Sequence, residues 1–487
     1  MASMSLGPAR FILVLLVVAA LPTGAASPEP PSTPSAPPDA SDELPLPPHL
    51  RSPPKITLKD ALAFALQNQP AVKEALARVA ARETDVGIPR GQWLPTVGVT
   101  AQILGGTVNN TTTSYVGEPW TPTPRVGGTS STDASGASWS PKASTFVGLG
   151  VTQQIFDFGR IAAEIRAADA LVSVDQRSSE ARSLDVRFGV EEAYFAVYSA
   201  RAVLAATEEA YARAQSAFAL AKQGVASGSR PPFDRTRIEA QLARLDVTRV
   251  RNRGALRIAQ SLLAAAVGSS ELALDIADTP PAPADMPPLD VAIQHALQKE
   301  PALQAALVRI QAQEAATRAA YAQLRPDLFV FGTLNSRAGG AQPSGSAPIP
   351  DGNGWLPIVP NWQIGLVLSW PIFDGTFFAK GKASEQLEAV RREEAAVVRQ
   401  QLVTRVETAY VAVIVAREAL PRIRTALEAA RTNYAQAQAR FRSGLGSTTD
   451  LADAESIWVE AQTGLALGEF EMARARAAFG RAIAEGS

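Results

Sequence analysis

The residue types that most often carry catalysis or hold metal ions are scarce in this chain. It has 487 residues, no cysteine and two histidines, His49 and His295. Without cysteine there is no disulfide, no cysteine-based zinc site and no thiol nucleophile. Serine and aspartate are plentiful, but no Ser-His-Asp relay and no glycine loop with the spacing of known phosphate-binding loops stands out. The sequence predicts no catalytic residue, metal site or cofactor, and a protein that is not an enzyme.

The charge balance argues against a second class of protein, the nucleic-acid binders. The chain carries 46 lysines and arginines against 47 aspartates and glutamates, a formal net charge of −1. Binding to a phosphate backbone needs a strong basic excess. Hydrophobic residues make up 46% of the chain and charged residues 19%, so there is ample material for buried surface. No nucleic-acid partner is expected.

The first residues have the pattern of an export signal. Arg10 precedes eleven apolar residues, Phe11–Leu21, and small residues follow up to Ala26. This run is too short to cross about 30 Å of hydrocarbon, which favours a Sec signal peptide over residues 1–26 rather than an anchoring helix. Residues 27–54 contain 11 prolines in 28 positions and are predicted to form a disordered tether. No later apolar run suits a membrane helix, which leaves an exported soluble protein or a β-barrel.

The rest of the chain contains an internal duplication. Leu58–Ala71 resembles Leu289–Ala302 at an offset of 231, and Ile155–Asp157 matches Ile372–Asp374 at an offset of 217. Matches at an offset of 216 are Val190 with Val406, Tyr194 with Tyr410, Ser227-Gly228 with Ser443-Gly444, and Asp234 with Asp450. This recurrence predicts a first repeat over residues 55–275, a proline-rich linker over 276–288 and a second repeat over 289–487.

Each repeat has the same predicted order: a helix, two strands around a polar loop, a long helix, a tight turn and a return helix. The apolar residues of the long helices recur in steps of three and four, which is coiled-coil spacing. At about 1.5 Å per residue, each long helix reaches roughly 100 Å. We expect the shorter helices to stack end to end beside it. The helices are predicted over 57–88, 159–223 and 232–267, and over 289–324, 376–442 and 448–484.

Between these helices the apolar period changes to two. Strands are predicted over about 96–104 and 146–156, and over about 327–334 and 362–372. Val97, Val99 and Ala101, for example, alternate with small or polar residues, although the third strand alternates poorly. One apolar and one small polar face is what a membrane barrel shows to lipid and lumen, and a half-buried soluble sheet is the alternative.

Aromatic residues favour the membrane barrel because they gather near the predicted strand ends, where interfacial girdles belong. The candidate girdle consists of Trp93, Phe146, Phe156, Phe158, Trp362, Trp370, Phe373, Phe377 and Phe378. Four strands cannot close a barrel, and open strand edges cannot face lipid, so several chains must share one. Two chains would give a filled barrel and three chains a twelve-stranded one with a passage, while four chains are not excluded. Residues 105–145 and 335–361 are predicted to be extracellular loops.

Taken together, the chain resembles the TolC-like outer-membrane efflux proteins over residues 55–487. The resemblance rests on the duplication, on the order of helices and strands, and on the turns Gly228–Asp234 and Gly444–Leu451. It implies a mainly α-helical fold with a shared trimeric, twelve-stranded membrane β-barrel on a long periplasmic helical barrel. It also implies a homotrimer that works with a periplasmic adaptor (membrane fusion) protein and with an inner-membrane pump or ABC exporter. The implied function is an outer-membrane exit duct of a tripartite efflux pump or type I secretion system.

The resemblance also points to site residues at the periplasmic end. Asp450 and Asp453 match the acidic rings that constrict the pore, and their spacing of three lets both face the same way. Helix capping is the competing interpretation, and it is the expected role of Asp234. The turns would dock the adaptor through Val225, Gly228, Gly444, Leu445 and Gly446. Arg201 and Arg417 interrupt apolar stripes at matching positions, where most arginines are solvated or snorkel to water and a structural inter-helix ion pair is one option. The alternative function is an exported periplasmic coiled-coil scaffold without a pore.

Overall fold

The structure is a computed structural model that describes residues 53–107, 141–277, 286–339, 359–443 and 445–485. These residues belong to one unit, which begins at His49. The predicted signal peptide, nearly all of the tether, most of both loops and Gly444 lie outside the described residues.

The described elements follow the predicted order twice. The first repeat contains β1 (Lys55–Ile56), α1 (Leu58–Asn68), α2 (Pro70–Asp85), α3 (Gly87–Gly91), β2 (Thr96–Thr107), β3 (Pro141–Phe156), α4 (Arg160–Ala226), α5 (Pro232–Val267) and β4 (Asp275–Ile276). The second contains α6 (Leu289–Lys299), α7 (Pro301–Ala322), β5 (Asp327–Gly339), β6 (Val359–Ser369), α8 (Gly375–Arg442) and α9 (Thr448–Ala482).

The first predicted helix of each repeat is divided in the structure. Proline disfavours the helical conformation for the residue before it and lacks the N–H that would continue the helix. Gln69, before Pro70, has a ψ of 123°, and Glu300, before Pro301, has a ψ of 115°. The break therefore recurs at equivalent positions. The last strand also differs from its predicted span, since β6 ends at Ser369, two residues before Pro371.

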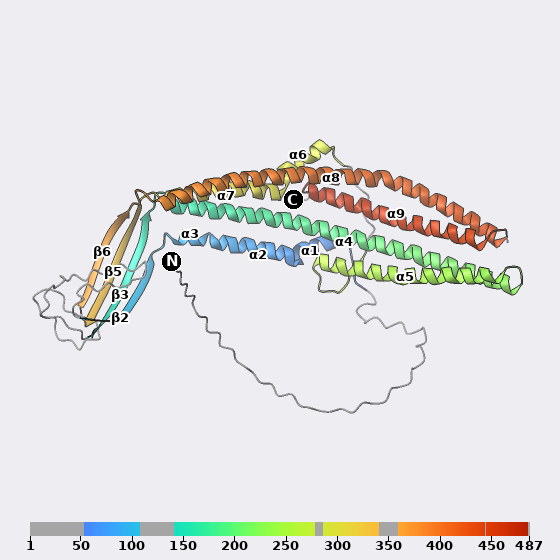
Figure 1. Cartoon of the computed structure of the whole chain (residues 1–487), viewed down its shortest axis with the longest axis horizontal. Helices are drawn as coiled ribbons and strands as arrows, with labels where there is room; N and C mark the ends of the chain where they lie inside the picture. Colours follow the sequence, from blue (N-terminus) through green and yellow to red (C-terminus); the bar gives the residue numbers. More distant parts are fainter. Residues whose placement is uncertain (1–52, 108–140, 278–285, 340–358, 444, 486–487) are drawn as a thin grey trace, which may run out of the picture. The chain divides into compact units, whose positions relative to one another are not determined.

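The four longer strands form one antiparallel sheet in the order β2-β3-β5-β6 (Figure 1). Thr96 pairs with Thr152, and their equivalents in the second repeat, Asp327 and Ser369, also pair. The two hairpins therefore share one register. β3 joins them by pairing with β5, with a register shift between Gln154 and Phe156. Within the described residues, β2 and β6 are left as the edges of the sheet.

The helices pack as two equivalent sets. Near the sheet the packing order is α2, α4, α7, α8, and toward the turns it is α5, α4, α9, α8. The turns between α4 and α5 and between α8 and α9 lie at the end of the helices away from the sheet (Figure 1). The end of α5 meets the α1–α2 break, because a Cβ on Gly268 would lie 2.8 Å from the Gln69 Cα. The short helices thus stack end to end beside the long ones, as predicted.

Apolar clusters hold each repeat together halfway along the helices. The first is built around Val190, Tyr194, Val197 and Leu263, and the second around Leu402, Val406, Val413 and Phe479. A third cluster lies near the turns and includes Ile238, Tyr434 and Phe441 from both repeats. None of the helices in the described part of the chain combines the length and the apolarity that crossing a bilayer requires.

Candidate functional site: the two helix turns and the sheet

The first turn, between α4 and α5, reverses the chain by means of a glycine. Gly228 has a φ of +74°, a conformation that side chains disfavour. The carbonyl oxygen of Gly224 accepts bonds from the backbone N–H groups of Ser229 (2.9 Å) and Arg230 (3.1 Å) and from two serine hydroxyls. Pro232 then begins α5, where a missing N–H does no harm. Sequence and local geometry agree that this turn is tight.

The second turn, between α8 and α9, is closed by different means. The backbone N–H groups of Leu445 and Gly446 both donate to the Arg440 carbonyl oxygen over 2.9 Å. A Cβ on Gly446 would lie 2.9 Å from the Phe441 nitrogen, so glycine is required. Ser447 and Asp450 form a capping box at the start of α9, in which each side chain accepts a bond from the other residue's backbone N–H. Leu445, which lies between these hydrogen-bonded residues, is 86% exposed.

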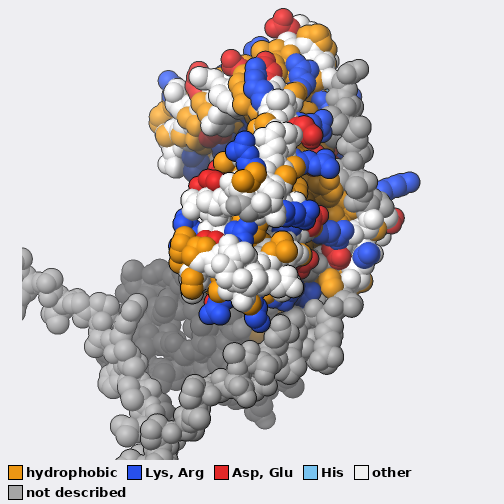
Figure 2. All heavy atoms as spheres, turned by 90° about the vertical axis from the view of Figure 1, so that its right-hand side faces the viewer, with side chains coloured by type: hydrophobic (Ala, Val, Ile, Leu, Met, Phe, Trp, Pro, Cys, Tyr) orange, Lys and Arg blue, Asp and Glu red, His pale blue; other side chains and the backbone are white. Residues whose placement is uncertain are grey.

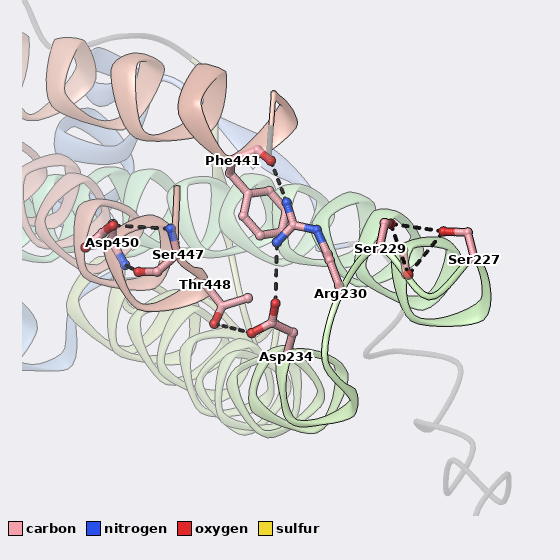
Figure 3. A network of polar contacts seen from close by, with 9 residues as sticks. Ser227, Ser229, Arg230, Asp234, Phe441, Ser447, Thr448 and Asp450 are labelled. Carbon is pink, nitrogen blue, oxygen red and sulfur yellow. Dashed lines mark hydrogen bonds and ion pairs between the residues drawn. The ribbon is translucent and has the colours of Figure 1, made fainter. Parts of the chain in front are cut away.

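One arginine ties the two turns together (Figure 3). Arg230 donates to the Phe441 carbonyl oxygen over 2.6 Å, and its guanidinium lies 3.8 Å from the centre of the Phe441 ring. It also contacts the Asp234 carboxylate at 3.5 Å, and the Thr448 hydroxyl donates to that carboxylate over 3.0 Å. We call Arg230, Asp234, Phe441 and Thr448 the turn cluster. Asp234 makes no capping hydrogen bond, contrary to the sequence expectation, because its carboxylate binds across the repeats.

The two aspartates predicted to line a pore lie beside this cluster and are exposed. Asp450 accepts the Ser447 backbone N–H over 3.3 Å, so the capping interpretation holds for it. Asp453 forms no hydrogen bond or ion pair within the described part of the chain. Helical geometry places both on one face of α9. Figure 2 looks onto this end and shows Lys and Arg side chains spread across it among fewer acidic ones.

Farther along the helices, a charged cluster that the sequence did not reveal joins three of them. Arg213 of α4 donates to Glu455 of α9 over 3.0 Å and lies 3.7 Å from the centre of the Trp458 ring. Tyr434 of α8 packs at 4.9 Å from that ring. Burial raises the pKa of Glu455 above the usual carboxyl range, although Arg213 opposes this. Burial and the Glu455 charge raise the pKa of Tyr434 to about 12.

Arg201 and Arg417, the matching arginines of the long helices, have different surroundings. Arg201 pairs with the Asp275 carboxylate and donates to the Ile276 carbonyl oxygen over 3.1 Å, which fastens β4 to α4. Arg417 is exposed and forms no ion pair within the residues that the structure covers. Within the described residues, Arg201 therefore forms an ion pair and Arg417 does not, and the partner of Arg201 belongs to a strand rather than to a second helix.

The sheet at the other end shows one apolar face that crosses all four strands. In β2, β3 and β6 it consists of Val97, Val99, Val147, Leu149, Ile364, Leu366 and Leu368, which are between 40% and 72% exposed. The strand registers bring Leu328, Val330 and Leu334 of β5 to the same face. The poor alternation of β5 in the sequence hid this, because Phe329 and Phe331 occupy the opposite face.

Most of the predicted girdle residues lie where the sheet meets the helices. Trp93 precedes β2, and Phe156 and Phe158, whose rings meet edge to face at 4.6 Å, lie at the end of β3. Trp370 and Phe373 are 58% and 87% exposed just after β6. Phe377 and Phe378 begin α8, each with a lysine amine 5.5 Å from its ring. Trp362 lies farther along β6 and is 76% exposed. Phe146 is in β3, with its side chain outside the described part.

Comparison with known proteins identifies the same architecture. Protein CyaE of Bordetella pertussis is 25% identical over 414 residues, which cover 84% of this chain and 79% of that protein. The CmeC outer membrane channel of Campylobacter jejuni shares 16% identity with a TM-score of 0.70, covering 88% of this chain and 85% of that one. The outer membrane protein VceC of Vibrio cholerae shares 17% identity with a TM-score of 0.66, covering 88% and 95%.

The family comparison covers both repeats. Residues 62–269 and 292–485 match the model of the family described as outer membrane efflux protein. These two segments make up most of the chain, and one lies within each of the two repeats. The predicted mainly α-helical fold with its membrane sheet is confirmed. The function of an outer-membrane exit duct for efflux or secretion is also confirmed, which is the role of a channel family rather than an enzyme family. The chain belongs to the outer membrane efflux protein family.

Proposed function

We propose that three copies of the chain close one twelve-stranded barrel and form a passive duct from the periplasm to the exterior. The observation that carries this proposal is the continuous exposed apolar face of the sheet, together with its two open edges, β2 and β6. Lipid tolerates such a face but not unpaired strand edges. Other copies of the sheet satisfy those edges, and twelve strands leave room for a passage.

The exposed aspartates near the turns would set the narrowest, acidic part of the duct. Around a three-fold axis, Asp450 and Asp453 each become a ring of carboxylates, which attracts cations and repels anions. Their exposure supports this role, and the capping bond of Asp450 leaves one carboxylate oxygen free to face the lumen. Capping and pore lining are therefore compatible in the same side chain.

The turns themselves are the proposed docking site for a periplasmic adaptor, which links the duct to an inner-membrane pump or ABC exporter. Leu445 is 86% exposed at the second turn, and Phe233 is 61% exposed at the first. Exposed apolar side chains on well-ordered turns are suited to bury themselves in the surface of a partner protein. Val225, Gly228 and Gly446 form or shape the turns behind these anchors.

The decisive experiment is conductance in planar lipid bilayers with protein purified in detergent. A duct gives cation-selective channels, and replacing Asp450→Asn and Asp453→Asn together raises the conductance or weakens the preference for cations. The matched control is Glu239→Gln, which removes an exposed carboxylate of α5. This variant should leave the conductance and the cation preference unchanged. Unaltered selectivity in the double aspartate variant would contradict the ring. A protein that stays soluble and monomeric without detergent would support the scaffold alternative.

A further inference from the structure

The sheet has a second face, opposite the exposed apolar one, and the proposed function turns this face toward the passage. On β2 it carries Thr96, Gly98 and Thr100, and on β3 the residues that pair with the last two are Gly150 and Gly148. Small and polar residues are typical of the inside of a water-filled barrel. We call this side of the sheet the inner face.

The strand β5 departs from this composition with one acidic and two aromatic residues. Its first three inner-face positions are Asp327, Phe329 and Phe331. Side chains at every second residue of a strand stand in line, about 6.6 Å apart. A carboxylate and two phenyl rings therefore follow one another along the inner face, starting where the sheet meets the helices. We call these three residues the inner strip.

The duplication indicates that the sheet does not require these side chains for strand pairing. The counterparts of the inner strip in the first repeat, at the offset of 231, are Thr96, Gly98 and Thr100. The hairpin of β2 and β3 nevertheless has the same register as the hairpin of β5 and β6. Small and polar residues at these positions are thus sufficient for pairing, and the acidic and aromatic side chains of β5 call for another explanation.

Packing against glycine explains only one of the two rings. A Cβ on Gly365, the cross-strand neighbour of Phe331, would lie 2.8 Å from a carbon of the Phe331 ring. That ring therefore fills the space over the glycine backbone. Phe329 has no glycine opposite, because it pairs with Val367. Both rings remain partly exposed, so the strip can still contact another molecule.

The carboxylate of the inner strip has no cationic partner. Gln154 donates to one Asp327 oxygen over 3.3 Å, and within the described part of the chain Asp327 forms no ion pair. Arg160 is near enough to attract this carboxylate, but its guanidinium binds Glu164 over 3.1 Å. Asp157 adds a further negative charge nearby. Among these charged residues three are acidic and one is basic, so the local field favours a cation.

We propose that the inner strip binds organic cations with an aromatic body as they pass through the duct. This proposal rests on the proposed function, in which copies of the sheet close one barrel, and it names a class of cargo. The Asp327 carboxylate attracts the positive charge, and the faces of Phe329 and Phe331 attract both the charge and an aromatic ring. The acidic rings proposed at the other end of the duct favour the same sign of charge.

A metal cation suits the inner strip less well. Such an ion needs several oxygen, nitrogen or sulfur ligands, and the strip offers one carboxylate between a glutamine amide and two hydrocarbon rings. Nowhere in the described residues do three or more potential metal-binding side chains of histidine, aspartate or glutamate come together. The two phenyl rings are therefore better matched to an organic cation.

The test measures partial blocks of single channels by two cations of equal charge, tetraphenylphosphonium and the aliphatic tetrabutylammonium. The full-length protein is inserted into planar bilayers, and the duration of each block is recorded. Phe329→Leu with Phe331→Leu should shorten the blocks by tetraphenylphosphonium about tenfold. Leucine keeps an apolar side chain over Gly365 but has no aromatic face. Blocks by tetrabutylammonium should therefore change by less than about twofold.

Two further variants separate charge from aromatic contact. Asp327→Asn should shorten the blocks by both cations, because it removes the charge that attracts them. Trp362→Leu is the matched aromatic control, since it removes a 76% exposed ring from the opposite face of the sheet. It should leave the blocks by both cations unchanged. The conductance without added cation shows that each variant has assembled into a duct.

The outcomes distinguish this inference from the proposed function. Channels whose blocks by tetraphenylphosphonium last equally long in the wild type and in the double phenylalanine variant would overturn the binding site and leave the duct in place. A wild-type protein that forms no channels would overturn both. If the double variant does not assemble, Phe329→Leu alone provides the test, because this ring does not cover Gly365. It should shorten the same blocks about threefold, and unchanged blocks would contradict the site.

Discussion

Asp234 and Asp450 are equivalent residues of the two repeats, and the structure uses them in opposite ways. Asp234 is 7% exposed and contacts Arg230 of its own repeat and the Thr448 hydroxyl of the other repeat. Asp450 is exposed, and among the residues that the structure describes its carboxylate bonds only within its own turn. The duplication placed an aspartate at both positions. Its surroundings make Asp234 a link between the two turns, whereas Asp450 is exposed to solvent. The residue type alone does not set its role.

A second pair of equivalent positions, at the break before the second helix of each repeat, shows the same divergence. The amide of Gln69 donates to the Ala265 and Ala266 carbonyl oxygens over 3.2 Å and 3.0 Å. Its counterpart Glu300 is 1% exposed and accepts two bonds from Arg481, at 3.1 Å and 3.0 Å. A neutral contact in the first repeat is therefore a buried ion pair in the second.

Breaking this buried ion pair should have the largest effect on stability. Arg481→Leu leaves the Glu300 carboxylate buried without a cation and should lower the free energy of unfolding by about 3–5 kcal/mol. Gln69→Ala, at the position equivalent to Glu300, removes neutral hydrogen bonds and should cost about 1 kcal/mol. Urea titration in detergent measures both. Equal losses would show that the two repeats are held in the same way.

The next largest effect on stability should come from replacing each of the two equivalent aspartates, Asp234 and Asp450, by asparagine. Asp234→Asn weakens the charge-assisted contacts of the turn cluster and should cost about 1.5–3 kcal/mol. Asp450→Asn should cost below about 1 kcal/mol, because Asp450 is exposed at the third position of α9 and the asparagine amide oxygen still accepts the Ser447 backbone N–H. Thermal unfolding of each single variant makes the comparison. A larger loss of stability for Asp450→Asn than for Asp234→Asn would contradict the view that Asp234 links the turns and Asp450 does not.

The N-terminal caps of the two return helices, α5 and α9, should differ less in their contribution to stability. Ser447→Ala removes the capping box of α9 and should cost about 1 kcal/mol. The equivalent residue, Pro231, makes no side-chain capping bond at the start of α5, so Pro231→Ala should leave stability nearly unchanged. Unfolding titrations of both variants, with hydrogen exchange at the first turn of α9, would show whether the loss is local.

The buried carboxylate of Glu455 should make the stability of the protein depend on pH. Its pKa is raised in the folded protein, so the folded state binds the proton more tightly than the unfolded state. Its contribution to stability is full below the ordinary carboxyl range and is lost as the pH rises through the raised pKa. Glu455→Gln should flatten this slope, and Glu239→Gln, at the exposed equivalent position, should not. An unaltered slope in Glu455→Gln would contradict the assignment.

Much of the architecture could be predicted because it depends on local pattern. The return helix of the first repeat was predicted over 232–267, the span that α5 occupies, since prolines and a glycine bound its apolar pattern. The offsets between the repeats hold in the strand registers, because a duplicated hairpin keeps its pairing. The breaks at Pro70 and Pro301 were missed although their signal was present, since each proline restricts the residue before it.

The sequence by itself determined the repeat, the helix and strand order and the family, because these follow from apolar period, from turn residues and from recurrence along one chain. Only the tertiary structure decided which equivalent residues are buried and what they bind. Asp234 reaches Thr448 214 residues away, and Arg213 reaches Glu455 242 residues away. Such partners are chosen by the packing of distant helices, and no spacing along the chain encodes them.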